Sequence, residues 1–227
     1  MTRTRIQRLV AVGVLLISVM SVGVNGVAQA IPVTFQFEGT VFNANSPLNA
    51  IVLPGTPIRG SYTFDSMTPD TISDPSSGSY ALSALSVNFL GRTYSMGTHA
   101  RPNEIRVVNN NFFDEYRLLL IPSGLDQAIT GPSINGLIPR SFQFNLFGNM
   151  FTSDALPLVP PPLTSPPPPI ITMSFSGGGI AAGINASLTS LTSVPEPSSL
   201  VLMGLGLLGL SAVQIVRRRM GGGNSLR

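Results

Sequence analysis

The sequence predicts an all-β fold in which about eight or nine antiparallel strands form a β-sandwich. Two observations predict it. Apolar and polar residues alternate with a period of two in several short runs, so that one set of side chains faces a core and the other faces water. Gly, Pro, Asn and Asp separate these runs, and no apolar stripe with helical spacing extends beyond about two turns. A closed barrel is the alternative arrangement of the same strands.

The alternating runs follow one another through residues 31–193, which we take as one domain. The clearest runs have an aromatic or aliphatic side chain at every second position, and they are residues 33–38, 61–65, 85–89 and 142–146. Further strands are expected at residues 93–96, 105–109, 115–121, 170–176 and 184–191.

A proline-rich segment at residues 157–169 interrupts this pattern, because eight of its thirteen residues are proline. Proline has no backbone N–H and cannot continue the interior of a sheet, so the segment is expected to be an extended surface loop. It would connect the strand near residues 142–148 to the strand at 170–176.

The N-terminus has the features of a secretory signal peptide, residues 1–30. Three arginines within the first eight residues precede an apolar run at 9–24. Ala28 and Ala30 provide the small residues of a cleavage site before Ile31. We therefore expect export through the Sec translocon and cleavage by signal peptidase, with an uncleaved anchor as the alternative.

The C-terminus, residues 194–227, has the features of a membrane anchor. Residues 200–216 carry no charge, and a helix over 198–216 would span about 28 Å, which matches a hydrocarbon core. The arginines after it would keep the C-terminus inside. The turn before the helix and the basic stop after it comprise Val194, Pro195, Glu196 and Pro197, and Arg217, Arg218 and Arg219.

These three features in this order resemble the PEP-CTERM sorting tail of exported proteins from exopolysaccharide-producing Gram-negative bacteria. The resemblance covers about the last 30 residues, and it implies that a membrane-embedded exosortase recognises Pro195, Glu196 and Pro197 and cuts near them. An ordinary C-terminal anchor is the alternative. The alternating domain is more weakly similar to a β-rich module of other such proteins, and this similarity implies no activity.

The distribution of charge argues against nucleic-acid binding. Seven of the thirteen basic residues lie in the two terminal segments, and the remaining six arginines face nine acidic residues in the domain. The net charge of +3 therefore does not describe the domain, which is acidic. The chain has no cysteine, which excludes disulfides and thiolate metal sites.

Candidate chemistry in the domain is sparse. Asp65, Asp70 and Asp74 lie in a stretch rich in Ser, Thr and Pro, where carboxylates and carbonyl oxygens could bind calcium, although aspartate is also an ordinary turn residue. His99 is the single histidine, and no serine-nucleophile elbow accompanies it, so we expect no catalytic residue. Asp114 and Glu115 are adjacent and would point to opposite faces of a strand.

We therefore expect an exported protein, first tethered to the inner membrane and then delivered to the cell surface or extracellular matrix. A non-enzymatic structural or adhesive role is the first hypothesis, with exopolysaccharide as a partner. A calcium-assisted glycan-binding module is the second, and it would need an open sheet face with exposed tyrosines. A hydrolase that gathers distant carboxylates is the third.

Overall fold

The computed structural model describes residues 30–98, 103–110, 112–122, 126–163 and 167–195. Within these ranges no helix is both long enough and apolar enough to cross a membrane. The predicted signal helix and the predicted helix at 198–216 lie outside the described residues. The chain divides into two compact units, Met1–Ile31 and Pro32–Arg227, and the fold below is that of the second.

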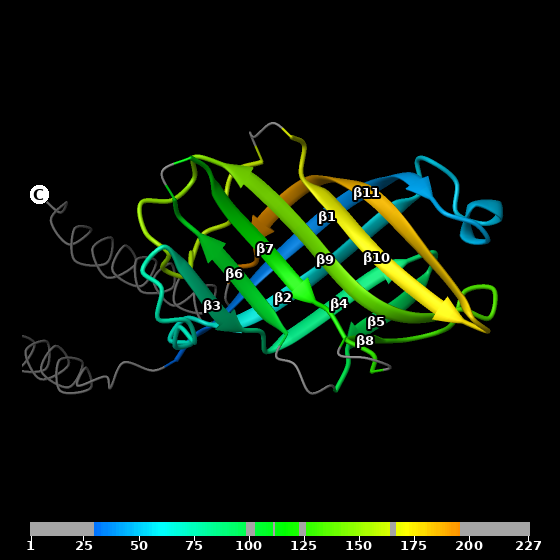
Figure 1. Cartoon of the computed structure of the whole chain (residues 1–227), viewed down its shortest axis with the longest axis horizontal. Coiled ribbons are helices and arrows are strands. Elements are labelled where there is room, and N and C mark those ends of the chain that lie inside the picture. The colour runs from blue at the N-terminus through cyan, green and yellow to red at the C-terminus, as the bar shows by residue number, and fades with distance from the viewer. Residues whose placement is uncertain (1–29, 99–102, 111, 123–125, 164–166, 196–227) are drawn as a thin grey trace, which may run out of the picture. The chain divides into compact units, whose positions relative to one another are not determined.

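The described part of this unit is built from antiparallel strands and one short 3₁₀ helix (Figure 1). The elements are β1 (Pro32–Ala44), η1 (Leu48–Ala50), β2 (Pro57–Asp65), β3 (Ser77–Ala81), β4 (Ala84–Phe89), β5 (Arg92–Met96), β6 (Glu104–Val108), β7 (Asp114–Leu120), β8 (Ile129–Thr130), β9 (Ile138–Gly148), β10 (Ile170–Gly177) and β11 (Ile180–Ser193). They form one sheet in the order β3-β6-β7-β9-β10-β11-β1-β2-β4-β5-β8.

The structure confirms the antiparallel all-β prediction and corrects its details. All nine predicted strands are present, and the described residues contain two more, β3 and β8, so the sheet has 11 strands. The predicted sandwich of two sheets is wrong. One sheet instead curls into a half-barrel, so that its two halves face each other across a common core.

Bulges in the longest strands accompany this curl, because an extra residue bends a strand and increases its twist. The pairing of β1 with β11 shifts register at Glu38/Gly39 and again at Val41/Asn43. The pairing of β9 with β10 shifts at Ser174/Phe175. The shift leaves Arg140 of β9 unmatched in the ladder, and its carbonyl oxygen accepts a hydrogen bond from Ala128 N–H at 2.9 Å, next to β8. The edge strand β8 is thereby brought back toward β9.

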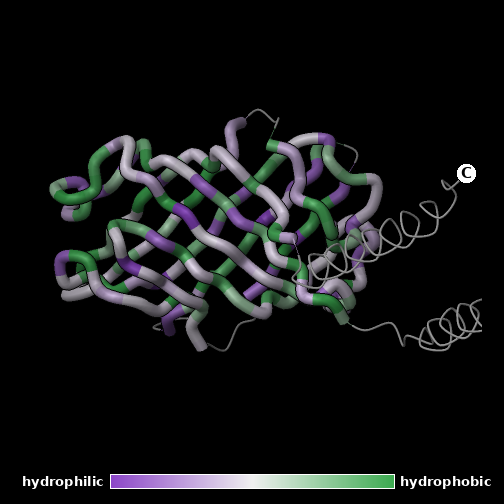
Figure 2. The backbone as a smooth tube through the Cα atoms, turned by 180° about the vertical axis from the view of Figure 1, so that it is seen from behind, coloured by the Kyte–Doolittle hydropathy of each residue, from purple (hydrophilic) through white to green (hydrophobic). Residues whose placement is uncertain are grey.

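The core inside the curl is aromatic and continuous. Phe144 of β9 packs against Tyr62 of β2 and Tyr116 of β7, with ring centroids 5.7 Å and 6.2 Å apart. Phe35 packs edge-on against Tyr62 at 5.6 Å. Hydrophobic and hydrophilic residues alternate along the strands, as Figure 2 shows. This alternation places one set of side chains in the core and the other on the outer face. The outer face of the sheet, opposite this core, is therefore mostly polar.

The proline-rich loop lies where the sequence predicts it, within the connection between β9 and β10. Asp114 holds the start of this connection, because its carboxylate accepts hydrogen bonds from the N–H groups of Met150 and Phe151. The hydroxyl group of Tyr80 in β3 donates a hydrogen bond to the carbonyl oxygen of Asp154 at 2.9 Å. These hydrogen bonds fix the first half of the connection to the end of the sheet.

Candidate functional site

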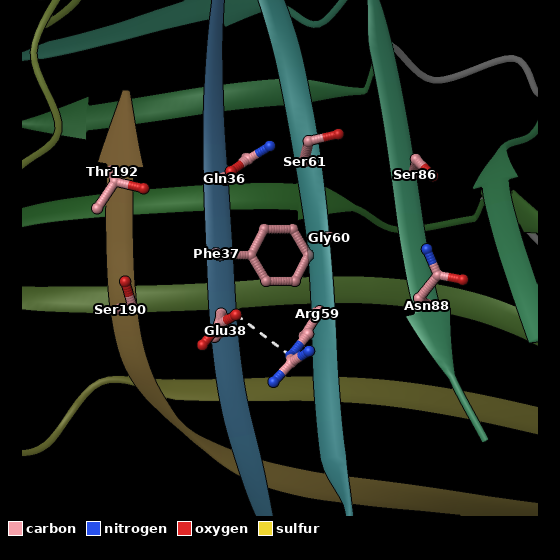
Figure 3. Close-up of a pocket in the computed structure, with 10 residues that line it drawn as sticks. All are labelled: Gln36, Phe37, Glu38, Arg59, Gly60, Ser61, Ser86, Asn88, Ser190 and Thr192. Atoms are coloured by element: carbon pink, nitrogen blue, oxygen red, sulfur yellow. Dashed lines mark ion pairs between the residues drawn. The ribbon is translucent and has the colours of Figure 1, made fainter. Parts of the chain in front are cut away.

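The main candidate site is a hollow on the outer face of the sheet, over β11, β1, β2 and β4 (Figure 3). Strand pairing places polar side chains from the four strands side by side in two rows. One row contains Thr192, Gln36, Ser61 and Ser86, and the other contains Ser190, Glu38, Arg59 and Asn88. We call the depression lined by these eight residues the polar hollow, and its volume is about 520 Å³.

The floor of the polar hollow is shaped by Gly60 and Phe37. They are direct partners across β1 and β2, and the Phe37 ring lies against the backbone of Gly60 from the core side. Phe37 is only 1% exposed, so the hollow offers polar groups and very little aromatic surface. A ligand here would be bound by hydrogen bonds rather than by ring stacking.

The polar hollow carries no net charge. Its single carboxylate, Glu38, pairs with Arg59 at 3.2 Å, and both side chains are more than half exposed. An exposed ion pair of this kind contributes little to stability and leaves both groups accessible to a ligand. Asn88 already accepts a hydrogen bond from Thr93 Oγ1 at 3.0 Å, which fixes its carbonyl oxygen and leaves its amide group as a donor.

The tyrosines do not contribute to this surface. Tyr62, Tyr94 and Tyr116 are fully buried, and Tyr80 is 6% exposed. Tyr62 and Tyr116 belong to the core, as the alternation of their strands indicates. The condition set for the calcium-assisted glycan-binding hypothesis, exposed tyrosines on an open sheet face, is not met.

Tyr62 and Tyr116 form a hydrogen-bonded pair inside the core, with their hydroxyl oxygens 2.9 Å apart. Burial is the largest cause that raises the pKa of Tyr62 well above its ordinary value, and the neighbouring Tyr116 adds to it. Burial likewise raises the pKa of Tyr116. The pair therefore remains neutral and joins β2 to β7 across the core.

The three aspartates predicted as calcium ligands are not gathered into one site. Each carboxylate binds backbone N–H groups of its own loop: Asp65 accepts from Met67, Asp70 from Ile72, and Asp74 from Ser76. Among the described residues, no group of three or more His, Cys, Asp or Glu side chains lies close enough to hold a metal ion. The bonds from Ser76 also lower the pKa of Asp74.

Asp70 has a second role that the sequence did not reveal. Its carboxylate accepts a hydrogen bond from Ser79 N–H of the edge strand β3 at 2.8 Å, and Thr71 N–H donates to the Ser79 carbonyl oxygen at 3.0 Å. The loop between β2 and β3 therefore covers part of an exposed sheet edge, which otherwise invites pairing with another chain. Asp70 thus has a structural role at this edge.

Asp114 and Glu115 serve separate faces of β7, as predicted. Asp114 binds the connection after β9, whereas Glu115 forms an ion pair with Arg117 two residues further along the same face. Glu115 is 3% exposed. This ion pair accounts for the buried Glu115 carboxylate, and the two acidic residues do not combine into one site.

The predicted sorting turn begins where β11 ends. Ser193, the last residue of β11, is the partner of Phe35 in β1, and Val194 N–H donates to the Thr34 carbonyl oxygen at 2.9 Å. Pro195 follows and is exposed. A comparison with sequence families matches residues 193–219 to a profile described as the PEP-CTERM protein-sorting motif. The chain carries a PEP-CTERM sorting motif. No curated protein and no solved structure matches the chain.

The PEP-CTERM motif implies that the protein is exported, processed at a membrane, and handled by an exosortase. Of the residues predicted for sorting, Val194 and Pro195 are described by the structure. The others lie outside the described residues: Glu196, Pro197, Arg217, Arg218 and Arg219. Of the predicted signal-cleavage residues, Ala30 is exposed and in no strand, and Ala28 lies outside the described residues.

The polar hollow was not predicted, although six of its eight residues lie in predicted strands; Arg59 and Thr192 lie just outside them. Gln36, Ser61 and Ser86 occupy the polar positions of three alternating runs. The missing information is the order of the strands in the sheet, because only that order places β11, β1, β2 and β4 side by side. Period-two alternation gives the face of a residue and not its neighbour on the next strand.

Proposed function

We propose that this protein is a non-enzymatic structural or adhesive component of the cell surface or extracellular matrix of an exopolysaccharide-producing bacterium. Its PEP-CTERM motif supports delivery outside the cell. The polar hollow supports the adhesive role, and it is the single observation that carries this proposal.

The chemistry of the polar hollow favours a neutral polysaccharide as the partner. Hydroxyl, amide, carboxylate and guanidinium groups stand next to one another on adjacent strands, about 4.8 Å apart, and can donate and accept hydrogen bonds along a sugar chain. Glu38 and Arg59 balance each other, so a charged ligand gains no net attraction. Weak hydrogen bonds repeated along a polymer give useful binding through multivalency.

The test compares the processed protein, purified from its native cells, with a triple variant of the polar hollow: Gln36→Ala, Asn88→Ala and Thr192→Ala. The probe is the polysaccharide secreted by the same cells, and the measurement is co-sedimentation over a range of polysaccharide concentrations. We expect the variant to bind the polysaccharide at least about tenfold more weakly, since the net loss of even one or two hydrogen bonds lowers the affinity by this factor.

A matched control removes the same three residue types from the outer face of β9 and β10: Gln143→Ala, Asn145→Ala and Thr172→Ala. This control is expected to bind as the wild type does. Equal binding by all three proteins would contradict the proposal. A chelator arm separates calcium-assisted binding, because loss of wild-type binding in chelator would require a metal at the surface.

A further inference from the structure

β11 is held in two different ways along its length. From Ile184 to Ser187 it lies between β10 and β1 and pairs with both, whereas from Ile180 to Gly183 its ladder partner is β10. The pairing with β10 ends at Ser187, and Leu188 N–H donates to the Pro169 carbonyl oxygen at 2.9 Å. Beyond that point the ladder partner that the structure describes is β1 alone. We call residues 189–194 the strap.

The strap is separated from the rest of β11 by the register shift at Glu38/Gly39, which leaves Thr189 outside the regular ladder. After the shift, Ser190, Leu191, Thr192 and Ser193 face successive residues of β1. Leu191 is the one strap residue in the buried core, and it is 8% exposed. One-sided pairing and a single anchor place the strap at the low-stability end of the sheet.

The strap overlaps the sorting motif. The matched segment starts at residue 193, inside β11, and the hydrogen bond from Val194 to Thr34 lies one residue before Pro195. No linker therefore separates the folded sheet from Pro195, the first proline of the predicted sorting turn. Proteases act on chain that has left its hydrogen-bonded partners, so a paired segment is cleaved through its transiently open state.

We infer that the pairing of the strap with β1 gates the cleavage of the sorting tail. While the strap is paired, Pro195 is held one residue beyond the hydrogen bond from Val194 to Thr34. When the strap leaves β1, the turn extends and enters the exosortase. Leu191 and the β1 residues opposite the strap are then positioning residues for processing. This inference rests on the exosortase processing that the motif implies.

The test locks the strap with an engineered disulfide. Gln36 of β1 and Thr192 of the strap are direct partners on the outer face, and directly paired strand residues lie within the distance range of a disulfide. The natural chain has no cysteine, so Gln36→Cys/Thr192→Cys supplies the only pair. In pulse-chase labelling of the full chain in its native cells, we expect tail cleavage to slow by about tenfold or more and to recover with a membrane-permeant reductant.

The matched control carries the same Gln36 substitution but links β1 to β2: Gln36→Cys/Ser61→Cys. It locks the sheet and leaves the strap free, so its cleavage should match the wild type. Equal cleavage in the two disulfide variants, at whatever rate, would overturn the inference. Pro195→Ala/Glu196→Ala, measured in the same assay, tests exosortase recognition separately, so failure of the strap and failure of sorting give different results.

A second pair of variants approaches the same point by weakening the strap. Leu191→Ala removes its anchor, whereas Leu188→Ala removes a similarly buried leucine of the same strand just before the strap. Leu191→Ala should speed tail cleavage several-fold, and Leu188→Ala should not. Faster cleavage in both variants to the same extent would attribute the effect to general destabilisation and contradict the gate.

Discussion

Gly60 is required where the Phe37 ring crosses the backbone of β2. A methyl group at this position would lie less than 3.0 Å from the Phe37 ring and from the Ser86 carbonyl oxygen. We expect Gly60→Ala to lower the free energy of unfolding by about 1–3 kcal/mol, because the core must shift to make room. Urea denaturation of the purified processed protein measures this.

Gly183 is the control for this prediction, since a methyl group there meets its nearest atom, the Met173 carbonyl oxygen, at 3.6 Å. Gly183→Ala should be neutral or slightly stabilising, by at most about 1 kcal/mol, because alanine restricts the unfolded chain. Equal losses in Gly60→Ala and Gly183→Ala would show that the Phe37 contact is not the cause.

The buried pair of Tyr62 and Tyr116 makes the folded protein less stable at alkaline pH. Their raised pKa keeps both hydroxyls protonated in the folded state, whereas tyrosine in the unfolded chain titrates near 10. Above about pH 10 the unfolded state loses protons that the folded state retains, so stability is complete below this pH and falls as pH rises toward the folded pKa. Burial raises the pKa of Tyr80 and Tyr94 in the same direction.

We expect Tyr62→Phe to cost about 1–3 kcal/mol, because the buried hydroxyl of Tyr116 loses its partner. The double variant Tyr62→Phe/Tyr116→Phe should recover much of this loss and show a shallower decline in stability above pH 10. Denaturation curves at pH 8 and above provide the measurement. A pH slope unchanged in the double variant would place the titrating groups elsewhere.

At the scale of single residues, the sequence predicts the core better than the polar groups. Alternation assigns Phe35, Phe37 and Phe144 to the inside correctly, because burial of an aromatic ring outweighs local preferences. Alternation cannot distinguish a metal ligand from a turn residue. Asp70 has the residue type and loop setting of a calcium ligand, yet its carboxylate is used by Ile72 and Ser79.

At the scale of elements, Asp114 links β7 to the long connection between β9 and β10. It is 4% exposed and accepts from two backbone N–H groups of that connection. Asp114→Ala should lower the free energy of unfolding by about 2–4 kcal/mol, because both donors lose a charged acceptor. Limited proteolysis should then cut within residues 149–163 at protease concentrations that leave the wild type intact.

Asp126→Ala is the comparison for Asp114→Ala, because Asp126 is exposed. We expect it to change stability by less than about 0.5 kcal/mol and to leave the proteolysis pattern unchanged. If Asp114→Ala were equally harmless, the connection would be held by its other contacts, such as the hydrogen bond from Tyr80 to Asp154.

The two strands that the sequence does not predict are the two edges of the sheet. β3 has the sequence Ser-Gly-Ser-Tyr-Ala, without apolar alternation, and β8 has two residues. Edge strands pair on one side and can be short and polar, so they leave a weak pattern. The nine interior strands bury one face against the core, and the alternation of apolar and polar residues in them is correspondingly clear.

At the scale of the molecule, the sequence predicts one β domain between two processed ends but not the way its sheet closes. Two facing sheets and one curled sheet require the same alternation, and bulges such as that near Arg140 decide between them. The pairing of β11 with β1 also brings the first residues of the domain beside the last. β1 begins at Pro32, and its Thr34 binds Val194 at the start of the tail.

The folded domain and the removable sorting tail therefore meet at the pairing of β1 with β11. Changing Pro195 and Glu196 to alanine should therefore leave the domain folded but keep the precursor uncut and in the inner membrane. Gel mobility and membrane fractionation of native cells measure both outcomes. A control with one proline and one exposed acid replaced in the domain, Pro160→Ala/Asp126→Ala, should be processed normally. Normal processing of the Pro195/Glu196 variant would mean that the sorting signal lies in the apolar and basic parts of the tail.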